Sequence, residues 1–266
     1  MAVVGVPHTA AGLARDLGAL GVRPGSVLLV QASLRSVGPV AGGAAAVVEA
    51  LRAALGPGGT LVAYTATPEN STTSSLHRER VRGMSEAECA EYLAALPPFD
   101  PASTPASPTM GRLAEQIRTT PGALRSPHPQ TSFAAVGPGA RDLVGDHPLE
   151  SHLGEGSPLA RLYREGAQAL VIGPIERCTV YHLADYRTGR FPLREYACVV
   201  RGTGGGREWR RFEAPALDDG HLADLDREVR RLVGVPTGTV GSAPCRLMPV
   251  REVVDAAVTV QCQARR

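Results

Sequence analysis

The residues best suited to chemistry in this sequence are His182 and Asp185, three positions apart in the stretch CTVYHLADYR. Residues three apart on a helix share a face, so an imidazole and a carboxylate would face the same space. A carboxylate on one ring nitrogen fixes the tautomer of a histidine and raises its basicity, which suits a general base near neutral pH. Glu213, at the end of a predicted strand, is a second candidate partner, and spacing does not choose between Asp185 and Glu213.

The element that must position His182 is a short apolar run, residues 169–172, which ends at Gly173. A polar turn follows, and a helix is predicted from Thr179 onward. In α/β proteins the carboxyl end of a strand and the amino end of the next helix converge on one crevice, where reactive groups are placed. The simpler interpretation is a capping Thr179, a packed histidine and a solvated aspartate. Cys178 is expected to pack rather than to act as a nucleophile.

Two other helix starts could hold a ligand. The loop at residues 33–38 offers hydroxyl groups, backbone N–H groups and Arg35, a combination that suits a phosphate. Thr109 and Met110 begin a second predicted helix and could contact the same ligand, although an ordinary capped turn explains either sequence. His128 precedes a proline, which favours an extended conformation at the mouth of a strand; a structural histidine is the simpler interpretation.

The first third of the chain alternates predicted helices with predicted strands. The helices are expected at residues 9–20 and 42–55, and the strands at 26–30 and 60–64. Alternation with short Gly/Pro turns predicts an α/β fold. We therefore expect a single domain over residues 1–266, with a central mixed sheet flanked by helices.

Residues 65–108 break this alternation. The segment is long, polar and rich in proline, with one predicted helix at residues 85–96. A long irregular excursion inside a compact domain is usually a functional lid or binding loop, and the alternative is a poorly ordered surface insertion. We expect the excursion to lie on the substrate side.

The second half of the chain returns to regular elements. Two strands at 195–201 and 208–213 are predicted to form a hairpin through the glycine-rich residues 202–206. A single mixed strand is expected at 238–248. Helices are expected at residues 110–119, 138–143, 158–163, 222–232 and 250–258.

Composition limits the classes of protein that this chain could belong to. Hydrophobic residues make up 43% of the chain and aromatic residues 4%, so a sizeable core would consist mostly of Ala, Val and Leu. The formal net charge of +2 gives no reason to expect nucleic acid or an anionic membrane as a partner. No run approaches the roughly 20 apolar residues that a membrane-spanning helix needs.

Cysteine usage and the N-terminus indicate a reducing compartment. The five cysteines are scattered and form no CxxC pair, which argues against a metal site and against a disulfide framework. The first residues, MAVVGVPHTA, lack the basic region and long apolar stretch of a secretion signal. We expect a cytoplasmic protein without a bound metal.

Five motifs in this order resemble the aminoglycoside N3-acetyltransferase family, the antibiotic acetyltransferases unrelated to the GNAT fold. The two most specific are HPQTSFAAVG and LGEGSPLARLY, and the resemblance covers nearly the whole chain. The motifs occupy residues 31–38, 108–115, 128–137, 153–163 and 178–187.

The resemblance implies transfer of an acetyl group from acetyl-CoA to an amine of an aminoglycoside, at N3, which would confer antibiotic resistance. It implies that His182 is the catalytic base and that Glu213 supports it. It also implies a single α/β domain acting as a monomer or a homodimer. The residues that would bind CoA are Ser33, Leu34, Arg35, Ser36, Val37, Thr109, Met110 and Gly111.

A polycationic acceptor needs carboxylates and other polar groups around the site. Thr179 is a candidate donor for the oxyanion, and Asp218 and Asp219 are further candidate acids. The residues expected to contact the acceptor are Gln31, Glu69, Asp100, His128, Thr179 and Asp185.

The chain departs from the family pattern at the expected site. Gln31 stands where the family usually has His, Asp185 stands where Glu is common, and the turn at residues 173–177 is a residue short. These departures leave alternatives open: acetylation of another amine in a divergent, kasugamycin-like aminoglycoside, a biosynthetic acyltransferase, or an inactive CoA-binding relative.

Overall fold

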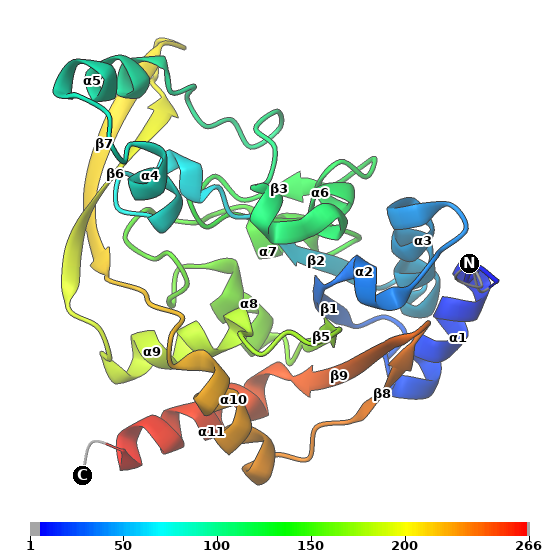
Figure 1. Ribbon diagram of the computed structural model, residues 1–266. Helices are drawn as coiled ribbons and strands as arrows, with labels where there is room; N and C mark the ends of the chain where they lie inside the picture. Colours follow the sequence, from blue (N-terminus) through cyan, green and yellow to red (C-terminus); the bar gives the residue numbers. More distant parts are fainter. Residues whose placement is uncertain (1–5, 265–266) are drawn as a thin grey trace.

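A mixed seven-stranded sheet forms the centre of the molecule (Figure 1). The computed structural model describes residues 6–264. The strand order is β3-β4-β2-β1-β5-β9-β8, with β1 parallel to β2 and to β5 and the remaining pairs antiparallel. The strands are β1 (Val27–Ala32), β2 (Thr60–Tyr64), β3 (Leu124–Arg125), β4 (Phe133–Val136), β5 (Gln168–Ile172), β8 (Thr237–Val240) and β9 (Ala243–Pro249).

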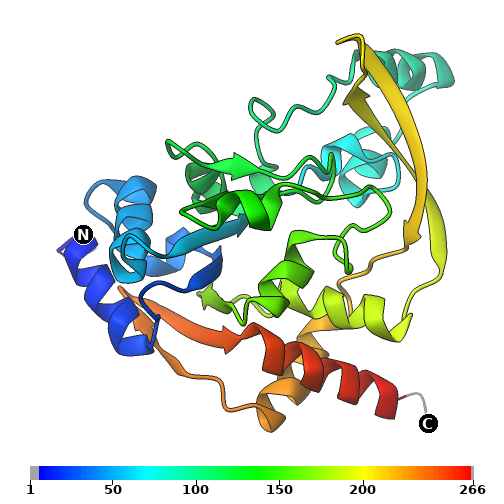
Figure 2. The ribbon, with the colours of Figure 1, turned by 180° about the vertical axis from the view of Figure 1, so that it is seen from behind.

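Helices cover both faces of this sheet, which confirms the predicted α/β fold with a mixed sheet (Figures 1 and 2). The strand side chains alternate between two buried clusters, because successive residues of a strand point to opposite faces. In β1, for example, Leu28 packs on one face and Leu29 on the other. The first face is covered by α1 (Ala10–Leu20), α3 (Gly43–Leu55) and α6 (Gly111–Arg118). The second is covered by α7 (Ala140–Val144), α8 (Pro158–Arg164), α9 (His182–Thr188), α10 (Leu222–Leu232) and α11 (Val250–Gln263).

Strands β6 (Leu193–Arg201) and β7 (Arg207–Pro215) form a separate hairpin. The hairpin is the long ribbon that arches over one side of the molecule in Figures 1 and 2. Its prediction from sequence is confirmed, although both strands are longer than expected. Tyr196 and Phe212 pack together in a small buried cluster on one face of the hairpin, and residues 196–199 of β6 are buried on both faces.

The excursion at residues 65–108 is more regular than its composition suggests. It contains η1 (Pro68–Asn70), α4 (Ser75–Arg80) and α5 (Glu86–Ala95), followed by η2 (Pro108–Met110). The hairpin holds the excursion in place. The Asn70 side chain exchanges two hydrogen bonds of 2.8 Å with the backbone of Val199, and Arg207 donates to the carbonyl of Leu96.

One local prediction is corrected by the structure. Residues 238–248 form two strands, β8 and β9, because Gly241 takes φ = 60° and reverses the chain. At the start of α1 the Thr9 side chain accepts from the Gly12 backbone N–H and caps the helix, whereas the Ser157 hydroxyl before α8 donates to the carbonyl of Gly154. Within residues 6–264, no helix combines the length and apolar character needed to cross a membrane.

Candidate active site

The carboxyl ends of β1 and β5 bring the predicted site residues together. Gly173, directly after β5, takes φ = 91°, and a Cβ atom there would lie 2.9 Å from the Ser36 hydroxyl oxygen. Only glycine therefore lets the end of β5 approach the loop that follows β1 so closely. That loop leads through Ser33 into the short helix α2 (Leu34–Val37), while β5 leads through η3 (Thr179–Tyr181) into α9.

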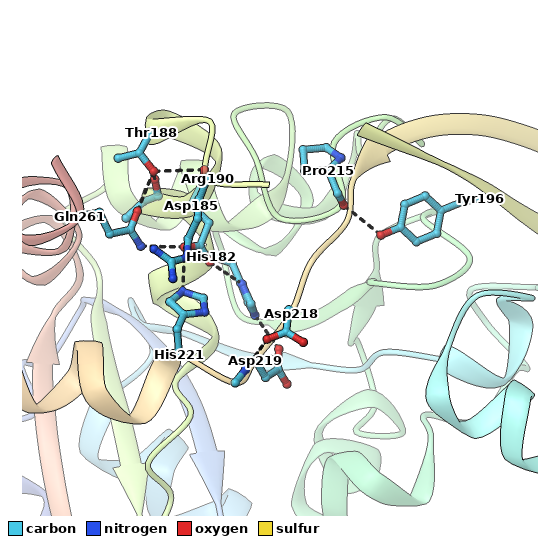
Figure 3. A network of polar contacts seen from close by, with 12 residues as sticks. His182, Asp185, Thr188, Arg190, Tyr196, Pro215, Asp218, Asp219, His221 and Gln261 are labelled. Atoms are coloured by element: carbon cyan, nitrogen blue, oxygen red, sulfur yellow. Dashed lines mark hydrogen bonds and ion pairs between the residues drawn. The ribbon is translucent and has the colours of Figure 1, made fainter. Parts of the chain in front are cut away.

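His182, the first residue of α9, is buried and bonded through both ring nitrogens (Figure 3). Nδ1 lies 2.9 Å from Asp185 Oδ2, and Nε2 lies 3.0 Å from Asp219 Oδ1. Ionised carboxylates only accept hydrogen bonds, so both nitrogens must carry a proton and the ring is an imidazolium. Burial lowers the pKa of His182, but the two carboxylates outweigh burial and raise it to about 9.

Asp185 is a fixed partner. It is buried, and its second oxygen accepts hydrogen bonds from His221 Nε2 at 2.9 Å and from Gln261 Nε2 at 2.7 Å (Figure 3). Thr188 Oγ1 in turn donates to the side-chain oxygen Oε1 of Gln261. Burial raises the pKa of Asp185, but the hydrogen bond and charge of His182, together with His221 and Gln261, hold it below its usual range. The carboxylate is therefore fixed in position and ionised.

Asp219 is an exposed partner. It lies in the loop between β7 and α10, and 58% of its side chain is exposed. Its hydrogen bond with His182 lowers the pKa of its carboxyl group below the usual range. Asp219 therefore contacts His182 from the solvent side, whereas Asp185 contacts it from inside the protein.

A cleft of about 860 Å³ opens beside His182. Its walls come from the excursion at residues 66–78, from Thr109 and Met110, from η3, from Arg194 and Tyr196 of β6, and from the loop at residues 217–220. Segments far apart in sequence thus converge on one side of the imidazole. The first part of the excursion therefore borders this cleft.

The residues expected to bind CoA lie in two adjoining segments. Thr109 and Met110 border the cleft, and a Cβ atom at Gly111 would lie 3.6 Å from the Ala32 carbonyl oxygen. The start of α6 therefore lies against the end of β1, next to the loop at residues 33–37. Within that loop the Ser36 hydroxyl donates to Ser33 at 3.1 Å.

Gln31 and Thr179 lie together, but they hydrogen-bond to each other and so leave the Thr179 backbone N–H without a free site for a ligand. Gln31 Oε1 accepts from the Thr179 backbone N–H at 2.9 Å and from the Cys178 thiol at 3.2 Å. The Thr179 N–H is thus used, which removes the backbone donor that an oxyanion could have taken from this residue. Burial raises the pKa of Cys178 to about 12, so its thiol stays protonated and is unsuited to be a nucleophile.

The expected pairing of Glu213 with His182 is corrected by the structure. Glu213 lies on the exposed face of β7, opposite Glu195, because Phe212 and Ala214 occupy the inner face. Both ring nitrogens of His182 are already bonded to Asp185 and Asp219. Asp185, the alternative that the sequence left open, is the buried partner.

Three other residues expected to contact the acceptor, Asp100, Glu69 and His128, have hydrogen-bond partners outside the cleft. Asp100 accepts from the backbone N–H groups of Ala102 and Ser103 and pairs with Arg201. Glu69 accepts a hydrogen bond from the Ser107 hydroxyl.

His128 is buried, with Nδ1 accepting from two backbone N–H groups and Nε2 bonded to the Leu149 carbonyl. It is the structural histidine of the simpler interpretation. Neither His128, Asp100 nor Glu69 borders the cleft.

The sequence did not reveal His221 and Gln261, and it placed Asp219 only among acids facing a substrate. All three lie more than 30 positions from His182 in the chain. They reach the imidazole network only because α10 and α11 pack beside α9. No local spacing signals such a meeting.

The arrangement defines a class of protein: an α/β enzyme with a histidine positioned between carboxylates in an open cleft. The family model described as "Aminoglycoside 3-N-acetyltransferase" matches residues 29–261. The aminoglycoside N(3)-acetyltransferase III of Serratia marcescens is 36% identical over 267 residues, which cover 95% of this chain and 96% of that protein. The chain therefore belongs to the aminoglycoside 3-N-acetyltransferase family, as the motifs indicated.

Solved structures resemble this chain over nearly its whole length. The YokD protein of Bacillus subtilis has a TM-score of 0.90 at 30% identity, covering 97% of this chain and 94% of that one. AAC-VIa bound to sisomicin has a TM-score of 0.85 at 31% identity, covering 98% and 99%. AAC-IIIb in a binary complex with CoASH has a TM-score of 0.82 at 30% identity, covering 97% and 98%.

Proposed function

We propose that this enzyme transfers the acetyl group of acetyl-CoA to an amine of an aminoglycoside antibiotic and so confers resistance to it. The observation that carries the proposal is the imidazole of His182, held by Asp185 beside a cleft that also reaches Thr109 and Met110. Family membership supports N3 as the acetylated position. We place the enzyme in the cytoplasm, where acetyl-CoA is available, as a monomer or a homodimer.

Acetyl-CoA would enter along residues 33–37 and 109–111. The start of α6 is the positive end of its helix dipole, and Arg35 adds a guanidinium, so the two segments suit phosphate groups. Thr109 and Met110 lead from this region into the cleft. That direction would bring the thioester toward His182. A complex of CoASH with the similar AAC-IIIb supports the same co-substrate.

The reaction requires the acceptor to lose a proton. An aliphatic amine is mostly protonated at neutral pH and cannot attack a carbonyl until it is neutral. The protonated His182 of the free protein cannot take that proton, because Asp219 holds its Nε2–H. We infer that the acceptor's ammonium group takes over the Asp219 carboxylate, which lowers the pKa of His182, so that the Nε2 proton leaves to solvent and Nε2 becomes able to accept a proton.

His182 Nε2 accepts one proton from the acceptor's ammonium group, and the neutral amine attacks the thioester carbonyl, forming the C–N bond. The C–S bond breaks as the tetrahedral intermediate collapses, and the second proton of the former amine passes from the nitrogen to the CoA thiolate. His182 then returns the first proton to solvent. Asp185 keeps Nδ1–H in place throughout. Holding both reactants in one cleft contributes up to about 7–11 kcal/mol.

A second candidate keeps the chemistry but changes the acetylated amine. Three arginines and only two aspartates border the cleft: Arg78, Arg177, Arg194, Asp218 and Asp219. This lining is less acidic than a polycation would favour. It supports a divergent, kasugamycin-like acceptor with fewer ammonium groups.

The test is release of free thiol from acetyl-CoA with a panel of aminoglycosides that includes kasugamycin, followed by NMR of each product. Turnover with one or more compounds is the expected result, and the acetylated nitrogen distinguishes the two candidates. Bound acetyl-CoA without turnover on any compound would contradict the proposal and favour a biosynthetic acceptor or an inactive relative.

A further inference from the structure

The end of the cleft beneath the hairpin carries three polar atoms without a hydrogen-bond partner in residues 6–264. They are Gln130 Oε1, His152 Nε2 and Arg194 Nε. Each belongs to a residue that borders the cleft. Gln130 and His152 are 3% and 2% exposed, so their polar atoms are not satisfied by bulk water. Leaving such groups unpaired is unfavourable, which points to a ligand that supplies the missing partners.

These residues form one cluster around Tyr196, which we call the hairpin subsite: Gln130, Thr131, His152, Arg194 and Tyr196. The centroid of the His152 ring lies 4.5 Å from the centroid of the Tyr196 ring. The guanidinium carbon of Arg194 also lies 4.5 Å from the centroid of the Tyr196 ring. Gln130 donates to the carbonyl of Ala197, the next residue along β6.

Three of the five members, Gln130, His152 and Arg194, are held so that one polar group of each remains for a ligand. Gln130 Nε2 donates to the carbonyls of Asn70 and Ala197, which fixes the amide and leaves only the acceptor Oε1. His152 Nδ1 is engaged by the Thr131 hydroxyl, which leaves Nε2.

Arg194 donates through Nη2 to the Tyr196 hydroxyl, and Tyr196 donates to the Pro215 carbonyl, as Figure 3 shows for the second of these bonds. Arg194 forms no ion pair with a carboxylate of the described chain within 4.0 Å. Its Nε–H is the group that remains.

Charge then selects the ligand. An ammonium group would be repelled by the unpaired guanidinium of Arg194, and a carboxylate would be repelled by the acceptor-only oxygen of Gln130. Hydroxyl groups suit both atoms, since a hydroxyl can accept from Arg194 Nε–H and can donate to Gln130 Oε1. Burial lowers the pKa of His152 to about 3, so its imidazole is neutral and adds no charge.

We propose that the hairpin subsite binds an uncharged, hydroxyl-bearing ring of the acceptor and selects a hydroxyl over an ammonium group at that position. The proposal rests on the proposed function, because it names the acceptor chemistry of the same cleft. The acceptor would lie across the cleft with its reactive amine toward Asp219 and a neutral ring toward Arg194.

The test compares neomycin B with paromomycin I, which differ by one amino group replaced by a hydroxyl. Dissociation constants are measured by calorimetry in the presence of CoA, so turnover is not needed. The wild type is expected to bind paromomycin I about ten-fold more tightly. Arg194→Gln should reduce the ratio to about two-fold or less, whereas Arg194→Lys, which keeps the charge, should retain it.

Arg211→Gln is the matched control, because Arg211 lies on the other strand of the hairpin, exposed and paired with Glu195. Its ratio should equal that of the wild type. Equal binding of the two compounds by the wild type, or an unchanged ratio in Arg194→Gln, would overturn the subsite even where both compounds are acetylated. If neither compound binds, the subsite and the proposed function fall together. Preferential binding of paromomycin I without acetylation would support the subsite and contradict the proposed function.

Discussion

Buried histidines in two regions of this protein differ in charge: His182 is protonated, whereas a cluster of three others is neutral. His182 lies between two carboxylates, and its pKa is raised to about 9. His128, His147 and His152 pack ring against ring, with centroids 4.6 Å apart for the pairs that include His128. Within residues 6–264, their rings bond to hydroxyl and backbone groups and not to a carboxylate. Burial lowers the pKa of His147 to about 4 and of His152 to about 3.

The difference shows that burial alone does not decide the state of an imidazole. In the histidine cluster, burial lowers the pKa values of the imidazoles, and the hydrogen bonds from backbone and hydroxyl groups do not offset this effect. The rings therefore stay neutral. At His182, the hydrogen bonds and charges of Asp185 and Asp219 exceed the cost of burying the cation. The cluster is therefore a neutral packing unit, whereas His182 is a protonated centre that we propose becomes a base once the acceptor binds Asp219.

The largest expected effect comes from removing the charged centre itself. His182→Ala should lower kcat by about 10³-fold, within the range that general acid–base catalysis contributes. The acetyl-CoA dissociation constant should stay within about two-fold, because no residue assigned to CoA is touched. Thiol-release kinetics and calorimetry measure the two quantities, and turnover near the wild-type rate would eliminate His182 as the base.

Removing the buried partner should have the next largest effect. Asp185→Asn leaves the shape but takes away the charge that orients and stabilises the imidazolium, so kcat should fall by about 10- to 100-fold. Glu213→Gln is the matched control and should leave kcat within about two-fold, since Glu213 is exposed on β7. The reverse outcome would restore Glu213 as the partner of His182.

Acid should lower the stability of the folded protein because the buried histidines His147 and His152 become protonated more readily when the chain unfolds. The folded-state pKa values of His147 and His152 lie below the ordinary 6.5, so the unfolded chain binds more protons between pH 6.5 and about 4. Stability therefore falls as the pH drops through that window. Urea unfolding at a series of pH values measures the slope, and His147→Gln should make it shallower. A slope in His147→Gln equal to that of the wild type would show that this histidine does not take part.

His182 should contribute the opposite dependence. Its folded-state pKa is raised, so its stabilising contribution is complete below pH 6.5 and is lost as the pH rises through about 9. Asp219→Asn should weaken this loss at alkaline pH, since one of the two carboxylates is gone. The effect is expected to be smaller than the acid effect, because Asp219 is the exposed partner. The same urea series, extended to pH 10, measures this loss of stability. If stability falls equally in Asp219→Asn and in the wild type, the His182–Asp219 pair is not its cause.

The sequence predicts the elements that follow from local runs and spacing of apolar residues. The apolar runs of β1, β2 and β5 are buried on both faces and were placed within a few residues, as were α1, α3 and α10. The pairing of His182 with Asp185 follows from their spacing on one helix.

The partners that come from other elements could not be predicted in the same way. Asp219, His221 and Gln261 meet His182 and Asp185 only through the packing of α9, α10 and α11. The predicted pairing of Glu213 with His182 is wrong because successive residues of β7 face opposite sides, and Glu213 lies on the outer side. Strands β8 and β9 were merged because the short turn at Gly241 interrupts the apolar pattern only briefly.

The most direct measurement is the pKa of His182 by NMR, in the free protein with labelled histidine and in Asp219→Asn. A value near 9 in the wild type is expected, with a clear fall in Asp219→Asn and a similar fall when an acceptor binds. A wild-type pKa at or below 6.5, unchanged in Asp219→Asn, would contradict the conclusion that two carboxylates hold this imidazole in its charged form.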